Sequence, residues 1–164
     1  MSVPRGLYAV VYVSRVQTHR IASLTLAAGT RLPAYATAMG RVLLADLTAP
    51  ELDRYLAKAE LQPLTARTIR TAEQLRDRLD DVRRQGWAAV DQELEEGLRS
   101  FSAPVRGANG QVIAALSMSY ATTIPQPEAT EQFLPVLLSA AAKTSERLGA
   151  RFTPDGRRRP QSPE

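Results

Sequence analysis

Hydrophobic and polar positions along the chain predict short strands that alternate with helices. The segments 7–13 (LYAVVYV) and 20–26 (RIASLTL) are rich in β-branched and aromatic residues, which is typical of strands. A short polar turn separates them. Gly29 and Pro33 then break the chain before a short helix of small residues within 32–45 (LPAYATAMGRVLLA).

Two further helices carry capping signals at their starts. Thr48 can cap a helix in which Pro50 suits the first turn and Glu51 completes a capping box. The sequence TAEQ at 71–74 forms a second capping box. The helix that follows has an apolar stripe and ends at Gly86 as a C-terminal cap. The stripe consists of Leu75, Leu79 and Val82.

Three short strands follow, at 87–93, 100–106 and 111–120. Asn109 and Gly110 join the last two, and this dipeptide is a strong hairpin signal because both residues tolerate positive φ. A hairpin excludes the crossover that a parallel pair would need.

A long final helix is predicted at 128–148, after Pro125 and Pro127 end the sheet. One predicted face carries Phe133, Leu137, Ala141, Thr144 and Leu148. Strand pairs that alternate with helices, and late strands joined by a hairpin, predict an α+β fold with a mostly antiparallel sheet. We find no internal repeat and no linker that divides two domains.

Composition excludes several classes of site. The 164 residues contain no cysteine and one histidine, His19, so disulfides, thiolate nucleophiles and cysteine-ligated metals are excluded. The net charge of +4 includes three arginines at 157–159. They lie in a proline-containing tail, 153–164, that we expect to be disordered, and without them the remainder is close to neutral.

The chain carries no sequence signal for a membrane or for a nucleic acid. No apolar run approaches the ~20 residues needed to span a bilayer, and residues 1–6 lack the apolar region of a signal peptide. We therefore expect a cytoplasmic protein without a membrane partner. No zinc-finger spacing, basic zipper or clear helix-turn-helix is present, so this chain is not expected to read DNA by itself.

The start of the small-residue helix is one candidate binding feature. The first amides of a helix have no intrahelical acceptor, and the helix dipole makes that end mildly positive. Small side chains at Ala36, Thr37, Ala38 and Gly40 would leave these amides within reach of a carboxylate or phosphate. The alternative interpretation is that the helix needs small residues in order to pack closely on a sheet.

Polar side chains on the predicted strands form a second feature. Ser117 and Ser119 share one face of the last strand, Ser100 begins the strand before it, and Asp91 and Glu93 share a face of the first. The alternative interpretation is that these polar side chains simply lie on a solvent-exposed face of the sheet. Together with apolar walls they would form a pocket of the kind that binds small molecules. The walls are Ile21, Leu24, Leu32, Met39 and Leu98.

These groups favour binding over catalysis. A serine nucleophile needs a base within hydrogen-bond reach, and the single histidine lies far away in the sequence on a predicted turn. Two carboxylates can perform acid–base chemistry, but aromatic residues for sugar stacking are few. We therefore expect no enzyme, no cofactor and no metal.

Several separated motifs resemble the C-terminal effector-binding domain of IclR-type bacterial transcriptional regulators. They occur in the order of that family and are GTRLPAYATAMGRVLLA (29–45), GWAAVDQE (86–93), EGLRS (96–100) and IAALSMS (113–119). The resemblance covers roughly residues 10–152. Arg20-Ile21 and the LPAYAT motif are most similar to the subgroup that controls aromatic-acid breakdown through protocatechuate and β-ketoadipate.

The resemblance implies a GAF-like domain over residues 1–152, in which a curved antiparallel sheet has helices on both sides. It places a small organic acid between the sheet and the start of the small-residue helix. By position, the implied polar contacts are the amides of Ala38 and Met39 with Asp91, Ser100, Ser117 and Ser119, and the walls are the five residues named above. Some members carry cysteine in place of Ser100. Asp91 is badly placed for an anion, so it would accept from a ligand hydroxyl or pair with Arg99.

The resemblance also implies partners. The effector would be of the hydroxybenzoate, protocatechuate or β-ketoadipate type, and the protein would form homodimers or tetramers. The winged helix-turn-helix of the family has no counterpart here, so DNA binding is implied only for a parent protein that carries it. A ligand-free assembly module and, less favoured, a small-molecule enzyme are the alternatives.

Overall fold

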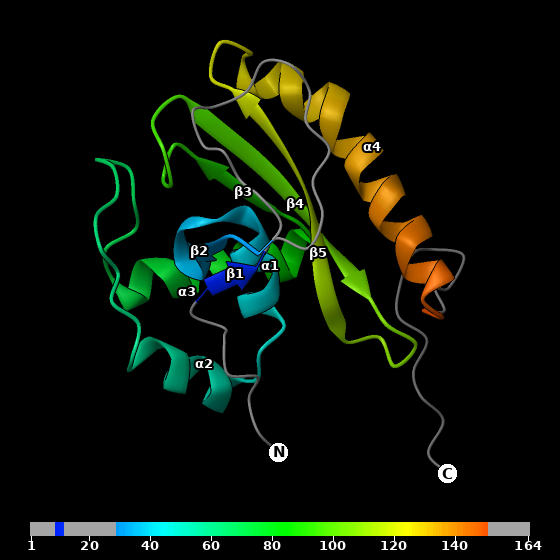
Figure 1. Cartoon of the computed structure of the whole chain (residues 1–164), viewed down its shortest axis with the longest axis horizontal. Helices are drawn as coiled ribbons and strands as arrows, with labels where there is room; N and C mark the ends of the chain where they lie inside the picture. The colour runs from blue at the N-terminus through cyan, green and yellow to red at the C-terminus, as the bar shows by residue number, and fades with distance from the viewer. Residues whose placement is uncertain (1–8, 12–28, 151–164) are drawn as a thin grey trace.

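The computed structural model of the protein describes residues 9–11 and 29–150, and its central element is a three-stranded antiparallel sheet (Figure 1). The strands β3 (Ala88–Asp91), β4 (Leu98–Arg106) and β5 (Val112–Ala121) lie in the order β3-β4-β5. The hairpin prediction is confirmed, because β4 and β5 pair antiparallel across the turn that contains Asn109 and Gly110. Gly110 has a φ of 77°, which favours glycine.

Helices cover both faces of this sheet (Figure 1). Helix α4 (Gln126–Arg147) packs on one face and α1 (Ala38–Ala45) contacts β4 and β5 from the other. Successive side chains of a strand point to opposite faces of the sheet, so each face can bury its own set of residues against a helix. The face toward α4 buries Phe101, Ala103, Val105 and Tyr120. The predicted α+β class with helices on both sides is confirmed.

The predicted face of the last helix is correct in its middle and wrong at its end. Leu137 and Ala141 are buried and Phe133 packs against the same cluster, but Leu148 is exposed. Leu148 follows the last residue of α4 and therefore does not continue its buried stripe. Ser145 is buried where the prediction placed Thr144, and its hydroxyl accepts a hydrogen bond from the amide of Arg106.

Helices α2 and α3 begin where the sequence predicts, and α3 also ends where it predicts. Helix α2 (Ala49–Leu56) starts with the capping box of Thr48 and Glu51. Helix α3 (Ala72–Gln85) is capped by Thr71, whose hydroxyl accepts from the amide of Gln74, and ends at Gly86 with a φ of 83°. In this box the Gln74 side chain accepts from Arg70 rather than from Thr71. The predicted stripe of α3 is buried.

Short segments at the start of the described chain complete the layer around α1. Strand β1 (Ala9–Val11) pairs antiparallel with β2 (Arg31–Pro33). The sequence analysis did not predict β2, because this strand is only three residues long. The 3-10 turn η1 (Ala34–Ala36) leads from β2 into α1. The predicted strand 20–26, with Ile21 and Leu24, and the tail 153–164 lie outside the described residues. No helix in the described ranges is long and apolar enough to cross a membrane.

Candidate functional site

Four serines lie together on the sheet face that is turned toward α1. The register pairs Ser100 with Ser119 and Ser102 with Ser117. Because Phe101 packs toward α4, its neighbours Ser100 and Ser102 point to the opposite face. The serines of β5 that are paired with them share that face. The structure thus brings together the three predicted serines and adds Ser102, which the sequence could have indicated because it lies two residues after Ser100.

The hydroxyls of these serines differ in their hydrogen bonds. The Oγ atoms of Ser100 and Ser119 lie 2.9 Å apart and share one hydrogen bond. Ser117 donates to the carbonyl of Phe101 at 2.8 Å, and Ser102 donates to the carbonyl of Leu116 at 2.9 Å. Ser102 is fully buried, whereas Ser119 is exposed. The face therefore presents Ser100, Ser117 and Ser119 to a molecule placed on it.

The start of α1 carries the amides of Ala38, Met39 and Gly40. Thr37 is the N-cap, and its hydroxyl accepts from the amide of Gly40 at 3.1 Å. The amide of Gly40 is therefore occupied, and Gly40 contributes to the start of the helix only through its lack of a side chain. Within the part of the chain that the structure covers, the amides of Ala38 and Met39 have no protein acceptor. Two donors remain at the positive end of the helix dipole.

The predicted apolar walls are partly described. Leu98 is half-buried and lies two residues before Ser100 on β4, so it shares the serine face. Leu32 is half-buried in β2, and Met39 packs against the core cluster around α1. The positions of Ile21 and Leu24 are outside the described residues.

Asp91 does not join the serines. It is paired with Arg99 in the register, whereas Val90 is the residue opposite Ser100, so Asp91 lies on the other face of the sheet. Its carboxylate forms ion pairs with Arg99 and Arg67, each at 2.6 Å. Of the two roles expected for Asp91, the structure shows the pairing with Arg99. Burial alone would raise the pKa of Asp91, but hydrogen bonds from Arg99 and Gln92 and the two positive charges lower it below its usual value.

This depressed pKa predicts a dependence of stability on pH. A carboxylate with a lowered pKa in the folded state stabilises the fold above its unfolded pKa, near 4, and the contribution is lost as the pH falls through the folded value. Asp91→Asn should cost less than about 1 kcal/mol at pH 7, since the pair is partly exposed. In urea unfolding at pH 7 and below pH 4, the difference between wild type and variant should shrink on acidification. A difference that is the same at both pH values would contradict this role.

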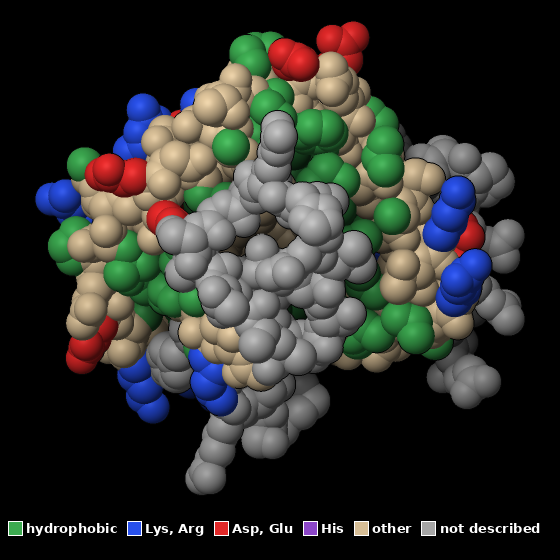
Figure 2. Space-filling model, turned by 45° about the horizontal axis from the view of Figure 1, so that its top comes forward, with side chains coloured by type: hydrophobic (Ala, Val, Ile, Leu, Met, Phe, Trp, Pro, Cys, Tyr) green, Lys and Arg blue, Asp and Glu red, His purple; other side chains and the backbone are tan. Residues whose placement is uncertain are grey.

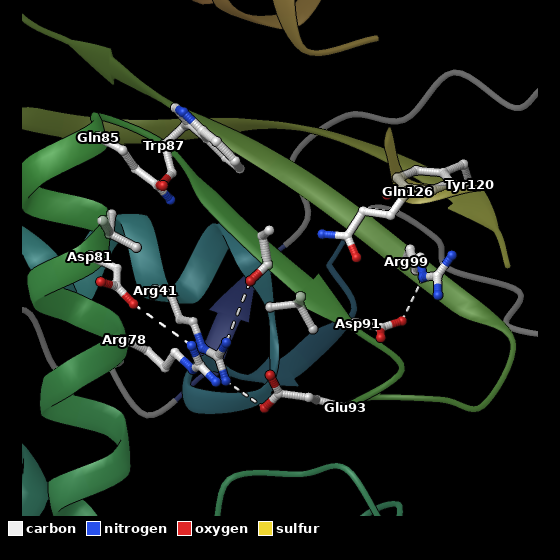
Figure 3. A pocket seen from close by; sticks show the side chains of 13 residues that line it. Arg41, Arg78, Asp81, Gln85, Trp87, Asp91, Glu93, Arg99, Tyr120 and Gln126 are labelled. Carbon is white, nitrogen blue, oxygen red and sulfur yellow. Dashed lines mark hydrogen bonds and ion pairs between the residues drawn. The ribbon is translucent and has the colours of Figure 1, made fainter. Parts of the chain in front are cut away.

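A buried ion pair lies beside this region (Figure 3). Arg41 of α1 is 2% exposed and donates to Glu93 Oε2 at 2.5 Å and to the carbonyl of Tyr35 at 3.1 Å. The same Glu93 oxygen accepts from the amide of Ile69 at 3.2 Å. Burial lowers the pKa of Arg41, while the charge of Glu93 opposes that shift. The sequence had favoured a solvated Glu93 and offered no signal for this pair.

A hollow of about 310 Å³ borders the ion pair, next to α3 and β3 (Figure 3). Arg41 and Glu93 lie at one side of it, and Asp91 and Arg99 at the other. Because these charged groups already pair with one another, the hollow offers no unpaired charge of theirs to a ligand. The serine face is therefore the better candidate for a binding site.

Other site types find no support in the described part of the chain. No group of His, Asp and Glu side chains there could hold a metal ion. On the face drawn in Figure 2, hydrophobic side chains are interspersed with uncharged surface, and most charged side chains lie toward the margin of the view. Among the described residues that are visible there, Lys and Arg side chains do not gather into a continuous basic patch of the kind that binds nucleic acid.

Comparison with protein families identifies the domain. Residues 5–146 match the model of the bacterial transcriptional regulator IclR C-terminal family. The chain belongs to this family. It is the effector-binding domain of an IclR-type regulator and is not an enzyme, and its arrangement of sheet and helices is GAF-like.

Individual relatives agree with this assignment. The Pca regulon regulatory protein of Pseudomonas putida is 45% identical over 134 residues, which are 80% of this chain and 46% of that protein. A regulator structure from Rhodococcus sp. RHA1 is 43% identical with a TM-score of 0.83, covering 87% of this chain and 57% of that one. The PobR inducer-binding domain from Acinetobacter, a double mutant solved with 3-hydroxybenzoic acid, is 32% identical with a TM-score of 0.73, covering 84% of this chain and 81% of that one. This chain thus spans about half the length of its Pseudomonas relative.

Proposed function

We propose that this domain senses a small organic acid bound between α1 and the serine face of the sheet. The observation that carries the proposal concerns the amides of Ala38 and Met39, which have no acceptor among the described residues and lie at the start of the helix that contacts β4 and β5. Two amides at the positive end of a helix favour a carboxylate. Ser100, Ser117 and Ser119 supply further polar contacts, and Leu32, Met39 and Leu98 supply apolar walls.

The relatives support an acid of aromatic catabolism. One relative regulates the Pca regulon, and the PobR inducer-binding domain was solved with 3-hydroxybenzoic acid. We infer an effector of the hydroxybenzoate, protocatechuate or β-ketoadipate type. Asp91 is left out of this site because it lies on the other face of the sheet.

The proposed role is regulatory. A ligand changes DNA binding only if it binds one conformation better than another, and a coupling free energy of ~1–3 kcal/mol is sufficient. We infer that the whole regulator acts in the cytoplasm as a homodimer or tetramer. It would contact DNA through a domain other than this one.

Removing two hydroxyls from the serine face tests the site. Ser117→Ala combined with Ser119→Ala should weaken binding of an acidic effector by roughly 1–3 kcal/mol, because the ligand loses hydrogen-bond partners while the fold is kept. Met39→Trp should block the site by its bulk. Isothermal titration calorimetry with 4-hydroxybenzoate, protocatechuate and β-ketoadipate measures both effects.

The control for this test is Ser139→Ala, since Ser139 is exposed on α4. This variant should bind like the wild type. If a ligand binds with an affinity that none of the site variants changes, the effector site lies elsewhere. If none of these acids binds and the oligomer is intact, the ligand-free assembly module is supported instead.

A further inference from the structure

The hydroxyl protons of the serine face are almost all committed. Ser117 uses its proton on the carbonyl of Phe101, so toward a ligand it can only accept. Ser100 and Ser119 share one hydrogen bond, so the two hydroxyls together keep one proton. Each serine oxygen also has two acceptor sites. The three accessible serines therefore offer one donor and several acceptors.

The start of α1 has the opposite character. The amides of Ala38 and Met39 are donors only, and both are free within the described part of the chain. A carboxylate, which only accepts, fits this end. A site with donors at one end and mostly acceptors at the other favours a ligand with an acceptor group at the first end and a donor group at the second.

From this asymmetry, and resting on the proposed function, we propose that the effector is a hydroxy acid rather than a dicarboxylate. Its carboxylate binds the amides of α1, and its hydroxyl donates to Ser117 or to the Ser100–Ser119 pair. A second carboxylate would place its negative oxygens next to the serine oxygens, and the three serines together have only one proton to donate to it. Such a ligand loses hydration without regaining equivalent hydrogen bonds.

Matched ligands test the proposal by calorimetry on the intact chain. 4-Hydroxybenzoate and 4-aminobenzoate carry a donor opposite the carboxylate, 4-fluorobenzoate carries none, and terephthalate carries a second carboxylate. We expect the two donor ligands to bind at least about tenfold more tightly than the other two, which is the worth of one well-made hydrogen bond. The aliphatic pair 6-hydroxyhexanoate and adipate should show the same order.

Serine variants test whether the preference for hydroxy acids depends on the hydrogen-bonding groups of these serines. Ser117→Ala should reduce the preference for 4-hydroxybenzoate over 4-fluorobenzoate, because two acceptor sites disappear. Ser100→Ala should also reduce this preference, because acceptor sites are lost while Ser119 keeps one free proton, the same number that the pair had. Ser102→Ala is the control, since Ser102 is fully buried and should not change the preference. Thermal unfolding confirms that each variant is folded.

The outcomes separate this proposal from the proposed function. If 4-fluorobenzoate or terephthalate binds as tightly as 4-hydroxybenzoate, or adipate as tightly as its hydroxy counterpart, the hydroxy-acid proposal is wrong and the acid-binding site stands. If no member of either series binds, both are overturned. A preference that survives Ser117→Ala and Ser100→Ala unchanged also contradicts the assignment to these hydroxyls.

Discussion

Arg41→Met is expected to destabilise the domain by about 3–5 kcal/mol, because breaking one side of a buried ion pair leaves an uncompensated charge. Without Arg41, the carboxylate of Glu93 remains buried with the amide of Ile69 as its described hydrogen-bond donor. The carbonyl of Tyr35 loses its hydrogen bond from Arg41 as well. Urea unfolding followed by circular dichroism measures the change.

Two controls separate burial of charge from loss of packing. The double variant Arg41→Met with Glu93→Leu should recover a large part of the lost stability, since an apolar pair of similar volume removes the unpaired charge. Arg76→Met breaks the pair with Asp53 on the surface, where both side chains are largely exposed, and should cost less than about 1 kcal/mol. An Arg41→Met variant as stable as Arg76→Met would show that the buried pair does not hold α1 in place.

Features that depend on neighbouring residues could be predicted from the sequence. The caps at Thr48 and Thr71, the end of α3 at Gly86 and the hairpin at Asn109-Gly110 all rest on contacts within a few residues. The faces within one strand could also be predicted, because side chains alternate with a period of two. The grouping of Ser117 with Ser119 on one side of β5 follows from that alone.

Features that depend on register between strands could not be predicted. The sequence placed Asp91 with Ser100, but the loop between β3 and β4 sets the pairing so that Val90 lies opposite Ser100. That loop includes two positive φ angles, 59° at Gln92 and 80° at Gly97, and a change of one residue in register would exchange the faces.

The buried ion pair escaped prediction for a related reason. Arg41 and Glu93 are 52 residues apart in the sequence. Considered alone, each is a charged residue that would be expected at a solvent-exposed position. Their burial follows only once α1 is packed beside β3. Long-range pairing of this kind has no local signature.

The small residues of α1 illustrate both interpretations that the sequence left open. The amide of Ala38 has no acceptor among the described residues, so the binding interpretation stays a prediction there. Gly40 instead serves packing: a Cβ atom there would lie 2.1 Å from the carbonyl oxygen of Ala34, which belongs to the backbone of η1. The α1 helix and η1 approach each other closely because this position has no side chain.

Gly40→Ala should therefore destabilise the domain by about 1–3 kcal/mol, as overpacking does. Alanine favours a helix over glycine by about 1 kcal/mol, but this gain is smaller than the cost of moving η1 away from α1. Gly107→Ala is the matched control, because a Cβ atom there would meet the side chain of Ile113 at 3.4 Å, an ordinary contact, and should change stability by less than about 0.5 kcal/mol. Chemical unfolding of both variants measures the change in the free energy of unfolding. If Gly40→Ala is as stable as Gly107→Ala, η1 can shift away from α1 at little cost, and glycine is not required for the close approach of the two elements.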